Sequence, residues 1–192
     1  MSDLNELKQT FLDTFNKNIH RRGADKLLEW LETTDFFTAP ASTRFHAAHP
    51  GGLLEHSLNV YQVLIAKHYD PQTDDLESFT LVSLLHDLCK AGFYTQSFRN
   101  AKNAAGEWEK VPYYTVDDQF PYGHGEKSVY LIERFLRLKT EEAVAVRWHM
   151  GGFDDSVRGG SFALANAYEK YPLAVKLHLS DLEATYLCET RA

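Results

Sequence analysis

Apolar residues recur every three or four positions along most of this chain, a period that is typical of amphipathic α-helices. Segments rich in Pro, Asp and Gly interrupt the period, for example "YDPQTDD" after residue 68. The pattern therefore predicts an all-α fold, a helical bundle. The expected helices span residues 3–18, 24–33, 52–69, 76–90, 125–138, 141–150, 161–169 and 172–189.

One stretch, residues 98–123, departs from the helical period. It holds "NAAGE" between segments that contain Val, Tyr and Trp. Aromatic and β-branched residues favour strands, and a short Asn- and Gly-containing segment between them favours a turn. We therefore expect a small β-hairpin inserted into the bundle, long enough to serve as a flap over a site.

A length of 192 residues predicts a single domain, 1–192, with N-terminal helices over about 1–45 and a core over about 46–190. The net charge of −7 argues against an extended nucleic-acid surface. Two cysteines, Cys89 and Cys188, are too few for a disulfide framework and fit a reducing compartment. With no signal peptide and no apolar run long enough to cross a membrane, the expected location is cytoplasmic.

Polar, ligand-type side chains fall on the apolar faces of three predicted helices. His56 lies on one such face, His86 and Asp87 on a second, and Asp181 on a third. A single inward His is commonly a hydrogen-bonded core residue, and an Arg could pair with an inward Asp. A buried carboxylate is costly unless it is paired or bound to a metal, so three such helices together favour a shared cation. The apolar neighbours on these faces are Leu53, Val60 and Leu64; Phe79 and Val82; and Ala174, Leu177, Ala184 and Cys188.

Two further histidines extend this set. In "GHGEKS", His124 stands between glycines, where the backbone can approach a ligand closely; in "VRWHMGG", His149 stands at a predicted helix end. His124 could equally be an ordinary loop residue, and His149 a cation that complements a helix C-terminus. The ordered set of six is the stronger signal.

The order of these residues resembles the HD superfamily, whose helical core holds a divalent metal with H…HD…D. The two additional histidines resemble its bimetallic members, and the likeness covers residues from about 46 to 185. "FHAAHPGGLLEHSLNV" is similar to the start of the HD domain of YhaM-type exoribonucleases. "HDLCK" resembles the family's HD-x-[GC]-K form, with Cys89 in place of Gly, and lacks the acidic pair of guanosine tetraphosphate hydrolases. "WHMGGFDD" lacks the GYP segment of cyclic-dinucleotide phosphodiesterases.

The resemblance implies two metal positions that share one carboxylate. A carboxylate can bridge two ions because it has two oxygens, which a neutral imidazole with one lone pair cannot do. Imidazole and carboxylate ligands suit Mn, Fe, Co, Ni or Zn without choosing among them. The implied ligands are His56, His86, Asp87 and Asp181 for the first ion, and Asp87, His124 and His149 for the second.

This set suggests a metal-dependent phosphohydrolase, such as a phosphodiesterase, that acts on a nucleotide or another small phosphorylated substrate. Asp87 and Lys90 are the expected catalytic residues, with Lys90, Arg99 and Arg158 as phosphate contacts. Lys90 could instead complement a helix C-terminus, and the two arginines could be solvated surface charges. The stacking of a base on tyrosines of the hairpin region is a further possibility, weighed against packing within the hairpin. These tyrosines are Tyr113, Tyr114 and Tyr122.

Two other classes remain open. Inositol oxygenase and its relatives, which are di-iron oxygenases, also resemble the ordered set, including the Lys after the HD pair. A metal-binding module without turnover is the third class. Neither the substrate, the native metal nor the oligomeric state follows from the sequence.

Overall fold

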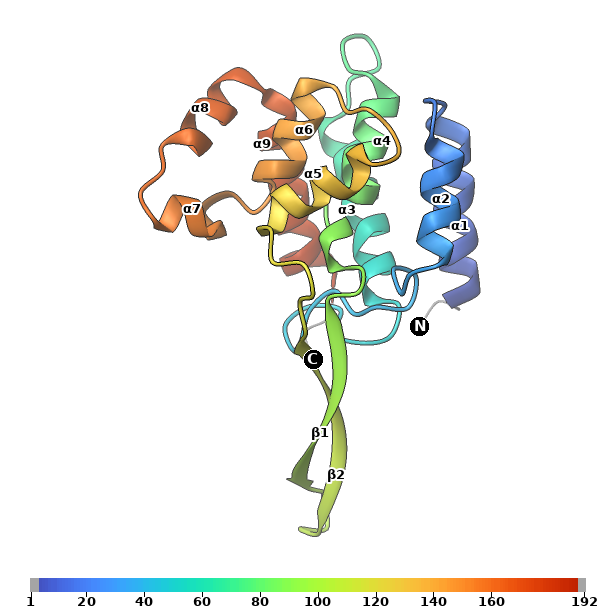
Figure 1. Ribbon diagram of the computed structural model, residues 1–192, viewed down its shortest axis with the longest axis vertical. Coiled ribbons are helices and arrows are strands. Elements are labelled where there is room, and N and C mark those ends of the chain that lie inside the picture. Colours follow the sequence, from blue (N-terminus) through green and yellow to red (C-terminus); the bar gives the residue numbers. More distant parts are fainter. Residues whose placement is uncertain (1–3, 190–192) are drawn as a thin grey trace.

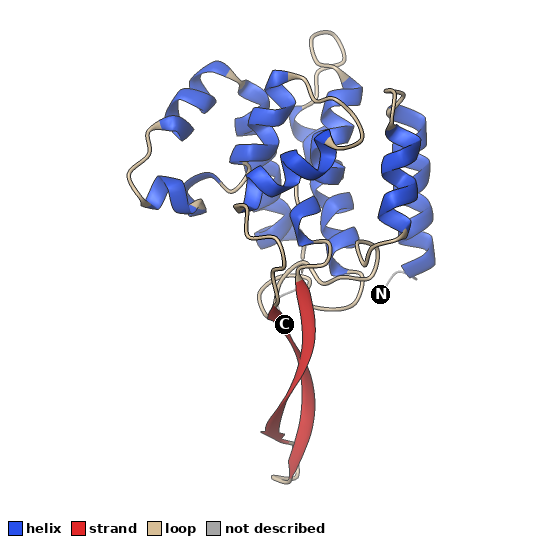
Figure 2. Cartoon of the chain, viewed as in Figure 1, coloured by secondary structure: helices blue, strands red, loops and turns tan. Residues whose placement is uncertain are grey.

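The computed structural model describes residues 4–189, most of which are helical (Figure 1, Figure 2). Residues 1–3 and 190–192, which include the ends of the predicted domain and of its first helix, lie outside the described part. No helix within 4–189 is long and apolar enough to cross a membrane. In chain order the α-helices are α1 (Leu4–Asn18), α2 (Ala24–Glu32), α3 (Gly52–His68), α4 (Leu76–Leu85), α5 (His124–Glu133), α6 (Thr140–Trp148), α7 (Asp155–Arg158), α8 (Ala163–Lys170) and α9 (Pro172–Glu183).

The predicted helices are present, but three of them end about five residues earlier than the pattern indicated. α5 ends at Glu133 rather than near residue 138. After α4 the chain makes a separate 3₁₀ turn, Leu88–Lys90, and after α9 it continues as a π-helical turn, Ala184–Cys188. Both irregular turns lie within a few residues of predicted metal ligands.

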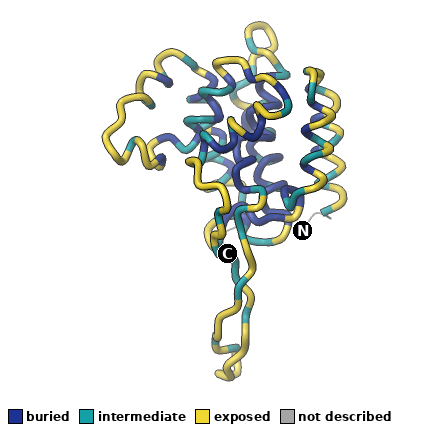
Figure 3. Tube along the Cα trace, in the orientation of Figure 1, coloured by how far each residue is buried: buried dark blue, intermediate teal, exposed yellow. Residues whose placement is uncertain are grey.

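The core lies where α3 and α4 pack together and where α9 packs against α3 and α6, and its segments are dark in Figure 3. Every residue of α4 from Ser78 to Leu85 is buried, so this helix has no solvent-facing side. The side chain of Asp75 accepts a hydrogen bond from the N–H of Glu77 and fixes the start of α4. The residues that follow α4 therefore emerge in the interior of the helical body.

The predicted hairpin is confirmed as a two-stranded antiparallel ribbon. Its strands are β1 (Tyr94–Lys102) and β2 (Trp108–Val116), in a register that pairs Tyr94 with Val116 and Lys102 with Trp108. It begins four residues before the predicted boundary, and its second strand ends before residue 123. The ribbon extends away from the helices (Figure 1), so the expectation of a flap folded over a site is wrong.

Candidate metal centre

The six predicted ligand side chains meet at one place, although they come from five helices. One lies within α3, two follow the last residue of α4, one begins α5, one follows α6 and one lies in α9. All six are buried or half-buried. They are His56, His86, Asp87, His124, His149 and Asp181.

The carboxylate of Asp87 is at the centre of this group, and its two oxygens face different histidines. Oδ1 lies 2.8 Å from Nε2 of His124 and 3.4 Å from Nε2 of His149. Oδ2 lies 3.5 Å from Nε2 of His56 and 3.5 Å from Nε2 of His86. The side chain is 3% exposed. Asp87 therefore separates the imidazoles into two pairs, one on each oxygen.

Backbone carbonyls fix the tautomers of the two histidines that end helices. Nδ1 of His86 donates to the carbonyl of Ser83 at 2.8 Å, and Nδ1 of His149 donates to the carbonyl of Val146 at 2.7 Å. A carbonyl only accepts, so the ring proton of each neutral imidazole is on Nδ1. Each His thereby satisfies a carbonyl at the end of its helix while its Nε2 lone pair faces Asp87.

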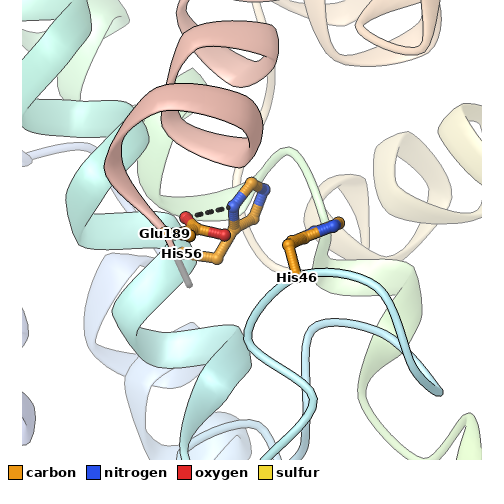
Figure 4. A group of neighbouring side chains, drawn as sticks. All are labelled: His46, His56 and Glu189. Carbon is orange, nitrogen blue, oxygen red and sulfur yellow. Dashed lines mark hydrogen bonds and ion pairs between the residues drawn. The ribbon is translucent and has the colours of Figure 1, made fainter. Parts of the chain in front are cut away.

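A carboxylate plays the corresponding part for His56 (Figure 4). Nδ1 of His56 lies 2.8 Å from Oε1 of Glu189, which also accepts a hydrogen bond from the side chain of Asn59. On its other side, Nε2 of His56 lies 3.2 Å from Oδ1 of Asp181 and 3.2 Å from Nε2 of His86. Glu189 thus orients the ring so that Nε2 points at the other ligand-type atoms.

The nitrogen and oxygen lone pairs of this group suit a divalent transition-metal ion better than they suit hydrogen bonds to one another. Nε2 of His149 is fully buried and makes no hydrogen bond, and its nearest carboxylate, Asp87, is an acceptor like itself. The Nε2 atoms of His56 and His86 face each other, and without an added proton neither could donate. A cation satisfies such lone pairs, and mixed imidazole and carboxylate ligands suit Mn, Fe, Co, Ni or Zn. His56, His86, Asp87 and Asp181 could hold one ion, and Asp87, His124 and His149 a second.

Protons occupy part of this centre when no metal is bound. Burial works to lower the pKa of His56, but hydrogen bonds to Asp181 and Glu189 raise it to about 10. Burial lowers the pKa of His86 to about 3, against the attraction of Asp87. His56 is therefore protonated at neutral pH and His86 is neutral.

His124 is placed by the close approach of α5 to α6. A Cβ on Gly125 would lie 2.1 Å from the carbonyl oxygen of Arg147, so only glycine allows this contact. Nδ1 of His124 lies 3.3 Å from Sγ of Cys89, while its Nε2 faces Asp87. Burial opposes the charged form, but Cys89 and Asp87 together raise the pKa of His124 to about 10.

Lys90 lies beside this centre and faces a cavity. Its ammonium is 2.6 Å from Oδ2 of Asp87, and the residue is 8% exposed. Burial opposes its charge, yet Asp87 holds the pKa of Lys90 above its usual value. The cavity has a volume of about 660 Å³. Its lining includes Asp87, Lys90, His124 and Asp181 together with Phe45, Met150, Phe153, Arg158, Leu182 and Tyr186.

Of the two arginines predicted to contact phosphate, one lies at the cavity and the other does not. Arg158 lines the same cavity as Lys90, whereas Arg99 lies on the ribbon with its guanidinium over the ring of Tyr113. Among the described residues, none from the two strands lines this cavity. The prediction that Arg99 contacts a phosphate at this centre is therefore corrected, because the ribbon carries Arg99 away from the helices. Tyr113 and Tyr114 also lie on the ribbon, so they do not stack on a base at this centre. Tyr122 stacks on Phe120.

The sequence patterns did not predict two residues that lie at the centre. Glu189 follows the last helical turn, and its side chain is 0% exposed. His46 precedes α3 in the loop, with its ring centroid 5.0 Å from that of His56 and its Nε2 buried without a partner. Burial, followed by repulsion from His56, lowers the pKa of His46 to about 4. A signal for His46 was its place in the stretch "FHAAHPGG", but neither residue lies on a helical stripe.

Such an arrangement can bind divalent metal and present it, together with a lysine ammonium, to a ligand in the cavity. Two ions bridged by a carboxylate suit reactions in which water attacks a phosphoryl group, and also reactions that need redox-active iron. Comparisons with protein-family models, with curated proteins and with solved structures found no match to this chain.

Proposed function

We propose that this protein is a metal-dependent phosphohydrolase that cleaves a phosphoester, of a nucleotide or another small phosphorylated metabolite, with a metal-activated water. One observation carries this proposal. Each carboxylate oxygen of Asp87 faces a different pair of imidazole Nε2 atoms, and the ammonium of Lys90 lies beside them. A carboxylate that can bridge two ions, with an ammonium group beside it, fits a two-metal phosphoester site. The HD-type helical bundle is part of the same proposal, supported by the order and the meeting of the six ligand residues.

Bound ions would supply Lewis acidity at a phosphoryl oxygen and lower the pKa of a coordinated water. The first set of ligands would be His56, His86, Asp87 and Asp181. The second set would be Asp87, His124 and His149. Six ligand-type side chains that already point at one another lower the cost of ordering the site.

The chain's own residues then have separate tasks. Lys90 carries a positive charge at the cavity wall, where it can bind a phosphoryl oxygen once an ion takes over the neutralisation of Asp87. Arg158 adds a second cation on that wall. The apolar side chains of Phe45 and Phe153 can hold an organic group and exclude water from the phosphoester.

A cytoplasmic location belongs to this proposal, because Cys89 and Cys188 are both free thiols. The proposed partner is a small phosphorylated molecule, since the cavity of about 660 Å³ is of the size of small-molecule sites.

The test is hydrolysis of a panel of phosphomonoesters, phosphodiesters and nucleotides by metal-reconstituted protein, with and without oxygen. We expect oxygen-independent release of phosphate or of a nucleotide product, lost in Asp87→Ala and retained in Asp13→Ala, whose carboxylate is exposed on α1. Oxygen-dependent product from a polyol or phosphonate, without hydrolysis, would assign the centre to the di-iron oxygenases. Tight metal binding without any turnover would assign it to a binding module.

A further inference from the structure

One face of the ribbon carries large hydrophobic side chains that are exposed to solvent. Residues directly opposite each other in an antiparallel pair project to the same side. On one side this places Phe98, Trp108 and Val116, which are 61%, 70% and 55% exposed. The complete face consists of the pairs Tyr94 and Val116, Gln96 and Tyr114, Phe98 and Pro112, Asn100 and Lys110, and Lys102 and Trp108. We call this set the ribbon face.

An isolated two-stranded ribbon is marginally stable in water and needs a layer packed on one side. Nine residues per strand give the ribbon a length of about 30 Å. Tyr94, at its foot, is anchored to the helical body, because its hydroxyl donates to the carbonyl of Ala41. Beyond this foot, Phe98 and Trp108 keep most of their surface exposed, so the helices of the same chain, as described, do not supply the missing layer. A second molecule can supply it.

The ribbon is suited to packing by its face rather than by its edge. Pro112 has no N–H to donate, which weakens β2 as a template for a further strand. The central pair of the face, Phe98 and Pro112, has two register pairs of the same face on each side. A two-fold axis through this centre would place Phe98 against its own copy, and Trp108 at the tip near Val116 at the partner's foot.

Charge favours the same antiparallel arrangement. Lys102 and Lys110 lie toward the tip of the ribbon face, and the foot of this face carries no lysine. Antiparallel stacking about that axis sets Lys110 opposite Tyr114 of the other ribbon and keeps the lysines of the two copies apart, whereas parallel stacking would put lysine against lysine. Nucleic acid is a poorer occupant, since the chain has a net charge of −7 and Glu107 and Glu109 offset two of the three basic residues of the ribbon.

We propose that the ribbon face is a dimerisation surface that binds the ribbon face of a second copy of this chain. Two ribbons of this length would bury on the order of 1,000 Å² in total, near the lower limit of specific interfaces. Each exposed aromatic anchor then gains a partner, and both ribbons gain the layer they lack. The inference is independent of the metal centre.

The first experiment measures the mass of the purified full-length protein by sedimentation equilibrium, from about 1 µM to about 200 µM, a range suited to an interface of this size. We expect a dimer that dissociates on dilution. Phe98→Ser combined with Trp108→Ser should raise the dimer Kd about 100-fold or more, because buried aromatic residues dominate such interfaces. The matched control is Phe162→Ser, which alters a residue that is 85% exposed outside the ribbon and should leave the Kd unchanged.

The second experiment is a charge swap. The two-fold axis sets position 96 of one ribbon opposite position 100 of the other, so Gln96→Glu with Asn100→Glu should weaken the dimer, whereas Gln96→Glu with Asn100→Lys should not. A wild-type protein that stays monomeric, or a dimer that is indifferent to the ribbon substitutions, overturns the proposal. A monomer that binds single-stranded RNA through Trp108 also overturns it and assigns the face to nucleic acid. Helical circular dichroism and metal content, unchanged in all variants, show that each variant is folded.

Discussion

The release of protons on metal binding follows directly from the protonation of the centre. At neutral pH the metal-free protein holds a proton on His56 and one on His124, since the pKa of each is raised to about 10. His86, whose pKa is lowered to about 3, holds none. A metal ligand must offer a lone pair, so filling both positions displaces at least two protons.

The pH dependence of the metal affinity follows from the number of displaced protons. Between pH 6.5 and 8.5, both groups stay below their pKa values, so each displaced proton contributes a factor of about ten per pH unit. A higher pH removes the protons more easily, and binding therefore becomes tighter as pH rises. The product of the two Kd values should fall about 100-fold per pH unit, and ionisation of a coordinated water would add to the slope in the same direction.

Calorimetry in two buffers of different ionisation enthalpy counts the protons, and competition with a chelator of known pH dependence gives the slope. The variant His124→Ala should keep the first metal and release one proton fewer. Binding with no proton release, or with the same release in His124→Ala, would refute the proposed protonation of the centre.

Three substitutions test the other roles. Lys90→Met should leave metal content intact and lower kcat/KM about 100-fold, because a phosphoryl oxygen loses its cation; unchanged turnover would reduce Lys90 to an ion-pair partner. His149→Ala should lose the second ion and keep the first, measured by elemental analysis, whereas His68→Ala at the end of α3 should change neither, and two full ions in His149→Ala would contradict the assignment. Glu189→Gln should weaken the first metal about tenfold by loosening the orientation of its His ligand. Its control, Glu183→Gln, removes a surface ion pair between the same two parts of the chain and should have no effect; equal losses in both would argue against a specific role.

Much of the centre could be predicted because buried polar residues are costly. His56 and Asp181 stand on stripes of apolar residues, and the structure buries their neighbours Leu53, Val60 and Leu177 as expected. A charge or an imidazole on such a face needs a partner, so the pattern indicated a shared site. α4 is buried all round, however, so the stripe of Phe79 and Val82 did not by itself mark the side of the helix on which His86 and Asp87 lie.

The π-helical turn limited what periodicity could predict at the end of the chain. Cys188 was expected on the stripe of Asp181, yet it is exposed. A π-helical turn over Ala184–Cys188 has more residues per turn than an α-helix, which rotates later side chains off the stripe. Glu189 then reaches His56, a contact that no regular period indicates.

The ribbon illustrates a similar limit. Its Val, Tyr and Trp residues and its turn predicted strand pairing, which depends on local sequence. Its direction depends on the short connections at 91–93 and 117–123, and on the anchoring of Tyr94 to Ala41, a contact between residues far apart in the chain. The pattern of strand residues carries no such information, so the flap was expected and the projecting ribbon was not.

The most direct test of the central claim is elemental analysis of anaerobically purified protein, beside the variant Asp87→Ala. The bridging role of Asp87 predicts about two divalent transition-metal ions per wild-type chain and a loss of both in the variant. A wild-type chain that takes up no transition metal, or an Asp87→Ala chain that retains two ions, would contradict it.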